Sequence, residues 1–216
     1  LSVDARDTPR KILHMKMTFP AAPGVFALSY PKWIPGEHGP TGPLTDVAGL
    51  VVTAAGKPLA WERDLVDMHT IRVTVPVGAG AVDLAFDFLM TADPSGFSSA
   101  ASATPQLLLL SWNQVLFYPS GRPSDSVSVA ATLALPAGWK YGTALPVQNE
   151  AGGVVKTRRN IGHQQDLHWG LRSVLATGGT RSRYKRTASE IRRVKWTPLS
   201  RQKVGRRSLR SSPDSH

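Results

Sequence analysis

The residues with the greatest capacity for chemistry lie in one unusual loop, residues 30–43, which reads YPKWIPGEHGPTGP. The loop contains four prolines and three glycines. Because proline fixes φ and glycine permits positive φ, the loop is predicted to be stiff and to adopt turns that other residues cannot. It presents Lys32, Trp33, Glu37 and His38, a combination that favours recognition over simple connection. The alternative is a structural corner in which Glu37 and His38 bond nearby backbone amides.

A second group of charged residues follows Trp61. Glu62, Asp64 and Asp67 alternate with Arg63, a pattern compatible with acid–base chemistry or with calcium binding. Because the spacing of a calcium-binding loop is absent and alternate residues of a strand point apart, we predict a salt-bridge cluster at the end of a loop. Two isolated histidines are interpreted as surface or capping residues: His14 and His69.

Several classes of catalytic site are excluded. The chain has no cysteine, which rules out disulfides, thiol catalysis and thiolate metal sites. Ser111 and Ser120 lack the Gly-x-Ser-x-Gly context of serine hydrolases, and no nucleotide-binding glycine motif is present. The close histidine pair His163 and His168 is five residues apart with no glutamate between, so it does not form a helical zinc motif.

Strands are the elements predicted to position these residues. Apolar and polar side chains alternate with period two through most of residues 1–150, and Pro- and Gly-containing turns separate the segments. The expected fold is therefore all-β, an antiparallel β-sandwich or saddle-like sheet. The apolar run Leu107–Tyr118 is predicted to be a strand buried on both faces or the join between two sheets. The clearest alternating segments contain Leu13, Met15, Met17, Phe19, Ile71, Val73, Val75, Val82, Leu84, Phe86, Phe88, Val127, Val129, Ala131, Leu133 and Leu135.

Charge divides the chain into two parts. Residues 1–150 carry 10 Lys+Arg against 12 Asp+Glu, whereas residues 151–216 carry 16 against 3, so the basicity belongs to the second part. We therefore expect a β domain at 1–150 and a basic, poorly ordered tail at 151–216, compatible with an unrelated extension or an out-of-frame translation. The tail is expected to attract polyanions non-specifically, and nucleic-acid binding through its aromatic residues is the functional alternative. The longest purely aliphatic run, Leu107–Leu110, is far shorter than the roughly 20 residues of a membrane span.

The 30–43 loop also carries a resemblance to a known family. Together with DVAGLV at 46–51 and WERDLVDMHTIRVTVP at 61–76, it resembles the amino-terminal domain of the glycyl aminopeptidase family of zinc metallopeptidases, metallopeptidase family 61. The resemblance covers about residues 1–147. It implies an enzyme whose separate catalytic domain binds zinc through a His-Glu-x-x-His motif, with a carboxy-terminal peptide-binding module in many members. Because this chain lacks that motif, neither zinc binding nor hydrolysis is expected from it alone.

The resemblance also suggests a role for the loop. In related aminopeptidases the amino-terminal domain borders the cleft that holds the free amine of the substrate. By this analogy Glu37 is the candidate partner of that ammonium group, with Tyr30, Lys32, Trp33 and His38 shaping the wall.

Further expectations follow for partners and compartment. The expected partner is the catalytic domain, and the isolated β domain should expose an apolar patch. The resemblance implies that the protein is exported to the periplasm. The rival function is an autonomous β-sandwich module that binds peptide or carbohydrate through the same loop.

Overall fold

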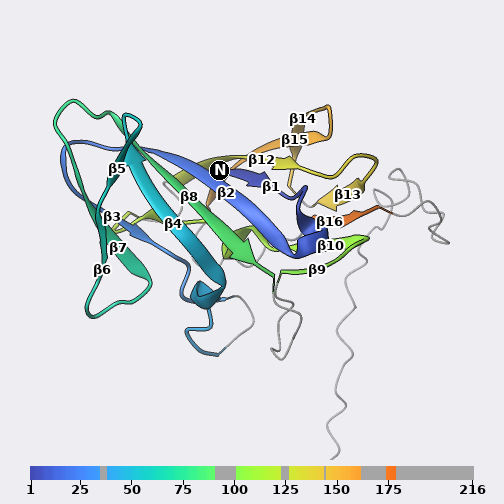
Figure 1. Cartoon of the computed structure of the whole chain (residues 1–216), viewed down its shortest axis with the longest axis horizontal. Coiled ribbons are helices and arrows are strands. Elements are labelled where there is room, and N and C mark those ends of the chain that lie inside the picture. The colour runs from blue at the N-terminus through green and yellow to red at the C-terminus, as the bar shows by residue number, and fades with distance from the viewer. Residues whose placement is uncertain (35–37, 91–100, 123–126, 144, 162–173, 179–216) are drawn as a thin grey trace, which may run out of the picture. The chain divides into compact units, whose positions relative to one another are not determined.

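A computed structural model describes residues 1–34, 38–90, 101–122, 127–143, 145–161 and 174–178 of the chain. All of these residues belong to one compact unit, Leu1–Arg181. Within this part of the chain, the helices are three short 3-10 turns: η1 (Thr8–Arg10), η2 (Leu44–Asp46) and η3 (Trp112–Gln114). Every other regular element is a strand, which confirms the predicted all-β class (Figure 1).

The largest sheet has eight strands. Only β1 and β12 pair in parallel, and all other neighbours in this sheet are antiparallel. The predicted antiparallel arrangement is therefore correct except at this pair. In order across the sheet, the strands are β14 (Val147–Ala151), β15 (Val154–Ile161), β12 (Val127–Ala134), β1 (Ser2–Asp4), β2 (Ile12–Pro20), β8 (Ala81–Leu89), β4 (Val47–Ala54) and β5 (Lys57–Leu59).

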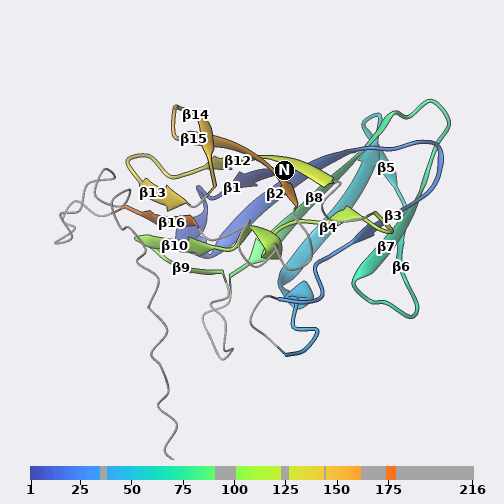
Figure 2. The same ribbon diagram turned by 180° about the vertical axis from the view of Figure 1, so that it is seen from behind.

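Two smaller four-stranded sheets lie at opposite ends of the large sheet, as Figures 1 and 2 show from the two sides. Their strands are antiparallel throughout. The first sheet runs in the order β13 (Lys140–Thr143), β16 (Val174–Thr177), β10 (Leu107–Leu110) and β9 (Ser102–Thr104). The second runs in the order β11 (Tyr118–Pro119), β3 (Gly24–Ser29), β7 (Thr70–Val75) and β6 (Trp61–Arg63).

The pairing of β2 with β8 shows how the alternating sequence builds the core. Leu13 lies opposite Phe88 and Met15 opposite Phe86, and all four side chains are buried. Each such side chain contributes about 1.5–3 kcal/mol by leaving water. The intervening residues face solvent, as predicted for half-buried strands.

His14 lies on that solvent-facing side of the sheet. Its Nδ1 is 2.6 Å from a carboxylate oxygen of Asp87 on β8, and its Nε2 is 3.6 Å from Asp7 beside η1. His14 is therefore a surface residue, as predicted, and its ring contacts a carboxylate on the neighbouring strand.

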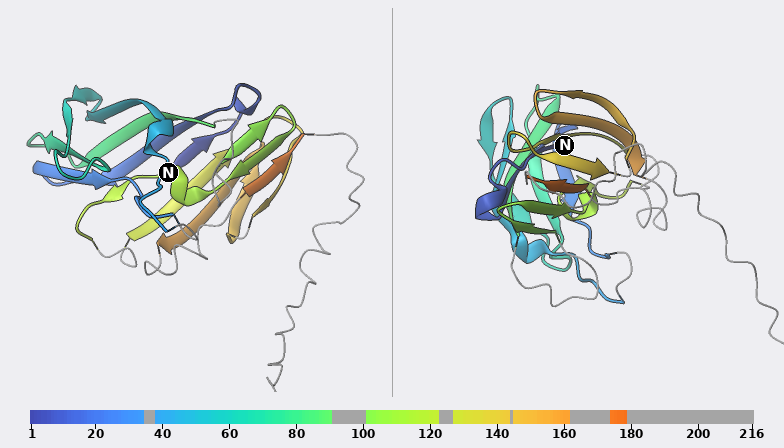
Figure 3. Two further views of the ribbon diagram at one scale, coloured as in Figure 1. Left: turned by 90° about the horizontal axis from the view of Figure 1, so that it is seen from below. Right: turned by 90° about the vertical axis from the view of Figure 1, so that its right-hand side faces the viewer.

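The apolar run Leu107–Tyr118 joins two sheets. It begins as β10 in one small sheet, turns through η3, and ends at β11 in the other. Every side chain from Trp112 to Phe117 is buried. The Phe117 ring lies edge-on to Tyr30 at 5.3 Å and to Phe86 of β8 at 5.5 Å, measured between ring centroids. This aromatic contact joins the second small sheet to the large one. Figure 3 shows the ribbon of these sheets from two further sides.

Paired strands continue beyond residue 150. The predicted boundary falls within the β14–β15 hairpin, and β15 pairs with β12 from Val127↔Ile161 to Ala134↔Val154. β16 then lies between β10 and β13. Residues 162–173 and 179–216 lie outside the described part of the chain, so the poorly ordered basic tail stays a prediction. No helix of the described residues is long and apolar enough to cross a bilayer.

Candidate functional site

Tyr30 anchors the beginning of the 30–43 loop in the core. Its side chain is fully buried, and its hydroxyl donates a hydrogen bond to the backbone carbonyl of Gln114 at 2.5 Å. Burial raises the pKa of the Tyr30 phenol, and the nearby Asp46 carboxylate raises it further. The buried Tyr30 side chain thus fixes the first residue of the 30–43 loop to the core of the domain.

The far end of the loop closes on its own beginning through Gly42. The Gly42 N–H donates to the carbonyl of Lys32 at 3.0 Å. A Cβ at position 42 would lie 1.9 Å from the carbonyl oxygen of Pro31. Only glycine can lie this close to the backbone of Pro31. The contact between the two ends of the loop therefore requires a residue without a side chain at position 42.

We expect Gly42→Ala to destabilise the domain by about 1–3 kcal/mol, because the backbone of Pro31 must move to admit the methyl group. Chemical denaturation with urea measures this loss. The matched control is Gly39→Ala in the same loop, where a Cβ meets nothing closer than 3.8 Å. Equal stability of the two variants would contradict the close approach.

A second loop, residues 64–69 between β6 and β7, lies beside the first. Its carboxylate anchor is Asp64, which accepts hydrogen bonds from the backbone N–H groups of Val66 at 2.8 Å and Asp67 at 2.7 Å. These N–H groups, that of Asp67 foremost, lower the pKa of Asp64. Arg72 of β7 forms an ion pair with the same carboxylate. The predicted salt-bridge cluster is confirmed for Asp64 and Asp67, but their cations are Arg72 and Lys32. Arg63 instead donates to the Met68 carbonyl.

Lys32 and Asp67 connect the two loops. The Lys32 Nζ lies 3.5 Å from Asp67 Oδ1, and the hydroxyl of Thr70 donates to the other oxygen of Asp67 at 3.0 Å. Burial acts to raise the pKa of Asp67, but the hydrogen bonds from Thr70 and the His69 backbone and the charge of Lys32 lower it overall. Asp67 is therefore held as a carboxylate at neutral pH and ties loop 64–69 to loop 30–43.

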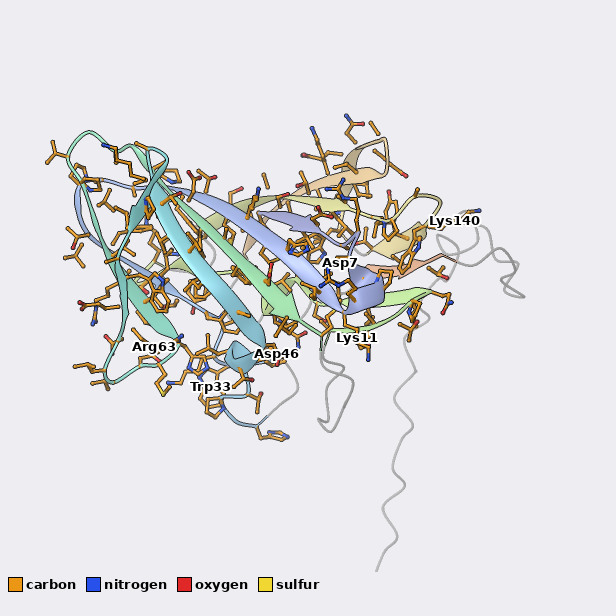
Figure 4. The ribbon with its side chains drawn as sticks, viewed as in Figure 1. Asp7, Lys11, Trp33, Asp46, Arg63 and Lys140 are labelled. Atoms are coloured by element: carbon orange, nitrogen blue, oxygen red, sulfur yellow. The ribbon has the colours of Figure 1, made fainter. Side chains whose placement is uncertain are left out.

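The two connected loops display large apolar side chains to solvent. Leu65 is 99% exposed and Val66 95% exposed, and Met68 and Trp33 are each more than half exposed. Figure 4 labels Trp33 and also Arg63, the residue that precedes loop 64–69. We call these four side chains the apolar surface.

The predicted site residues therefore have different environments. Tyr30 is buried, whereas Lys32, Trp33 and His38 are exposed on the loop. Glu37 lies outside the described residues. The apolar pair Leu65 and Val66 was missed by sequence reasoning, which interpreted the segment only through its charges. The available signal was an apolar pair between two turn-forming aspartates.

The described residues offer no set of ligands for a zinc ion. Nowhere among them do three or more His, Cys, Asp or Glu side chains converge. The carboxylates of the two loops are engaged with cations and with backbone N–H groups.

Comparison with known proteins identifies related sequences and folds. The family model described as the peptidase M61 N-terminal domain matches residues 1–160. No curated protein matches the sequence significantly. An aminopeptidase N family protein from Idiomarina loihiensis has a similar fold, with a TM-score of 0.65, 14% identity, and coverage of 82% of this chain and 28% of its own.

Two further solved structures show weaker similarity. Yeast LTA4 hydrolase, solved with bestatin, has a TM-score of 0.46 and 9% identity, with 82% of this chain and 27% of its own covered. An M1 zinc metallopeptidase from Deinococcus radiodurans has a TM-score of 0.39 and 15% identity, with 74% and 36% covered. The chain spans little more than a quarter of the first two of these three structures.

Proposed function

The chain belongs to the peptidase M61 N-terminal domain family, and on that premise we propose that it is the scaffold domain of a zinc aminopeptidase and borders the substrate cleft. In this proposal the zinc ion and the hydrolytic residues belong to a separate catalytic domain. This chain contributes shape and contacts, and it does not hydrolyse peptides alone. The 216 residues contain no His-Glu-x-x-His motif that would assign the chemistry to this chain.

The observation that carries the proposal is the construction of the 30–43 loop. Its beginning is anchored by Tyr30 in the core, and its end is closed by the Gly42 hydrogen bond to Lys32. Between these fixed points Trp33 and His38 remain exposed. A loop held at both ends while presenting polar and aromatic groups is preorganised for contact with a second protein surface or with a peptide.

Within this role, we assign Glu37 to the free amine of the peptide substrate. A carboxylate is the natural partner of an ammonium group, and the enclosed border between two domains strengthens such a pair by excluding water. Lys32 is already engaged with Asp67 within the domain. Lys32 therefore serves the loop, while Glu37 is assigned to the substrate.

The test uses this chain mixed with the separately expressed catalytic domain of an intact family 61 peptidase. With a glycyl anilide substrate, Glu37→Gln is expected to raise KM about 10-fold, the loss of about 1.4 kcal/mol of binding, with little change in kcat. The matched control is Glu150→Gln, because Glu150 lies on the exposed edge strand β14. An unchanged KM would remove the amine contact, and failure of the two proteins to associate would overturn the scaffold role.

The basic tail gives a separate and weaker expectation. Residues 151–216 carry 16 Lys+Arg against 3 Asp+Glu, which favours non-specific attraction to polyanions. The rival autonomous binding module would use the same exposed loop residues. It differs from the scaffold role in requiring no catalytic domain for ligand binding.

A further inference from the structure

We propose that the apolar surface formed by Trp33, Leu65, Val66 and Met68 is the principal docking surface for the catalytic domain. This inference rests on the proposed function and adds to it the side chains that make the contact. They come from the two connected loops, 30–43 and 64–69. Trp33 belongs to the loop that the resemblance singled out, whereas Leu65, Val66 and Met68 lie outside that loop and were not identified from the sequence.

The first argument is exposure. Leu65 and Val66 leave 99% and 95% of their surface in water, although they are adjacent and both aliphatic. Scattered exposed apolar residues are normal on protein surfaces, as Val25 and Val77 illustrate here. Leu65, Val66 and Met68 differ from these because they gather on one short loop, and Trp33 lies on the loop that Lys32 joins to it. Exposed large apolar side chains gathered in this way mark interaction sites.

The second argument is rigidity. The backbone N–H groups of Val66 and Asp67 are held by Asp64, and the Met68 carbonyl is held by Arg63. Leu65 and Val66 therefore project from a turn whose backbone is already ordered. A partner that binds them does not have to order the loop, which is the condition under which a few side chains supply most of the affinity.

The third argument is charge. The carboxylates beside the apolar surface are paired within the domain, Asp64 with Arg72 and Asp67 with Lys32. Arg63, which donates to the Met68 carbonyl, is a further charge beside the surface, and its partner there is a backbone oxygen. Among the described residues the surface therefore combines apolar side chains with paired carboxylates and one cation, which fits an apolar protein surface that carries a carboxylate or carbonyl opposite Arg63.

These properties indicate one occupant. Family membership makes this chain one domain of a larger enzyme, so the catalytic domain is a protein partner that must contact it somewhere. The apolar surface is connected through Lys32 to the loop assigned to the substrate cleft. A catalytic domain seated on Leu65 and Val66 would thus also cover the edge of the 30–43 loop, which is the arrangement that the cleft requires.

The test compares binding of the catalytic domain of an intact family 61 peptidase to three forms of this chain by calorimetry. The double variant Leu65→Ser/Val66→Ser is expected to weaken binding about 100-fold, as removal of central anchors does. The control is Val77→Ser, which changes a side chain that is 93% exposed in the β7–β8 turn and should alter Kd less than about twofold. All three forms should keep the same melting temperature, since the changed side chains make no core contacts.

The outcomes separate the two proposals. Binding that survives the double substitution would overturn the docking surface and leave the scaffold role standing. Absence of binding by the unmodified chain would overturn both. A dimer of this chain that Leu65→Ser/Val66→Ser dissociates, or adsorption to phosphatidylglycerol vesicles that it abolishes, would assign the surface to a different occupant and overturn the inference.

Discussion

A chain shortened to residues 1–150 is expected not to fold, whereas residues 1–178 should unfold in one cooperative transition. The shorter form lacks β15 and β16. β15 pairs with β12 along its whole length, and β16 is the central link between β10 and β13. Their loss exposes the backbone groups of three partner strands to water and leaves β14 without its neighbour.

The size of this effect follows from burial. Val155 and Ala176 are buried apolar residues, and the buried hydroxyl of Thr157 donates to the Pro146 carbonyl at 2.8 Å. The ladders of β15 with β12 and of β16 with β10 and β13 are lost as well. At about 1 kcal/mol for each ladder hydrogen bond and about 1.5–3 kcal/mol for Val155, the loss is comparable with the roughly 5–15 kcal/mol that stabilises a whole domain. Circular dichroism and urea titration measure it. A cooperative transition of residues 1–150 at the same urea concentration as residues 1–178 would show that β15 and β16 are dispensable and that the boundary at residue 150 is structural.

The second large effect is expected from Phe117→Ala, a loss of about 3–5 kcal/mol in the free energy of unfolding. Phe117 is buried between the rings of Tyr30 and Phe86, and its backbone N–H lies 3.3 Å from the sulfur of Met17. Removing the ring leaves a cavity where the two sheets meet and also removes the support of the 30–43 loop.

The control for this prediction is Leu107→Ala on β10, because Leu107 is 40% exposed. We expect it to cost less than about 1 kcal/mol. Urea denaturation of both variants gives the comparison. If Phe117→Ala were no more destabilising than Leu107→Ala, the aromatic contact would not be what joins the two sheets.

Local pattern was enough to predict the strand faces. Side chains of a strand alternate with period two, so Leu13, Met15, Met17 and Phe19 identify the buried face of β2 without knowledge of its neighbours. The stiffness predicted for the 30–43 loop rests on an equally local rule, because proline and glycine act on their own backbone. The strand β15 escaped prediction because basic residues interrupt its short apolar signal, and its pairing with β12 is supplied by a distant segment.

Contacts across the chain could not be read in the same way. The sequence alone determined an all-β domain, its alternating core, its chemically unusual loop and its family resemblance, because each of these depends on residue type and local spacing. Only the tertiary structure decided that Tyr30 is buried, that Lys32 meets Asp67, and that Asp64 pairs with Arg72 instead of its neighbour Arg63. The partner of a side chain depends on the order of the strands in the sheet and on which face of the sheet each side chain lies. Neither is contained in the spacing of residues along one segment, so the apolar surface emerged only from the folded chain.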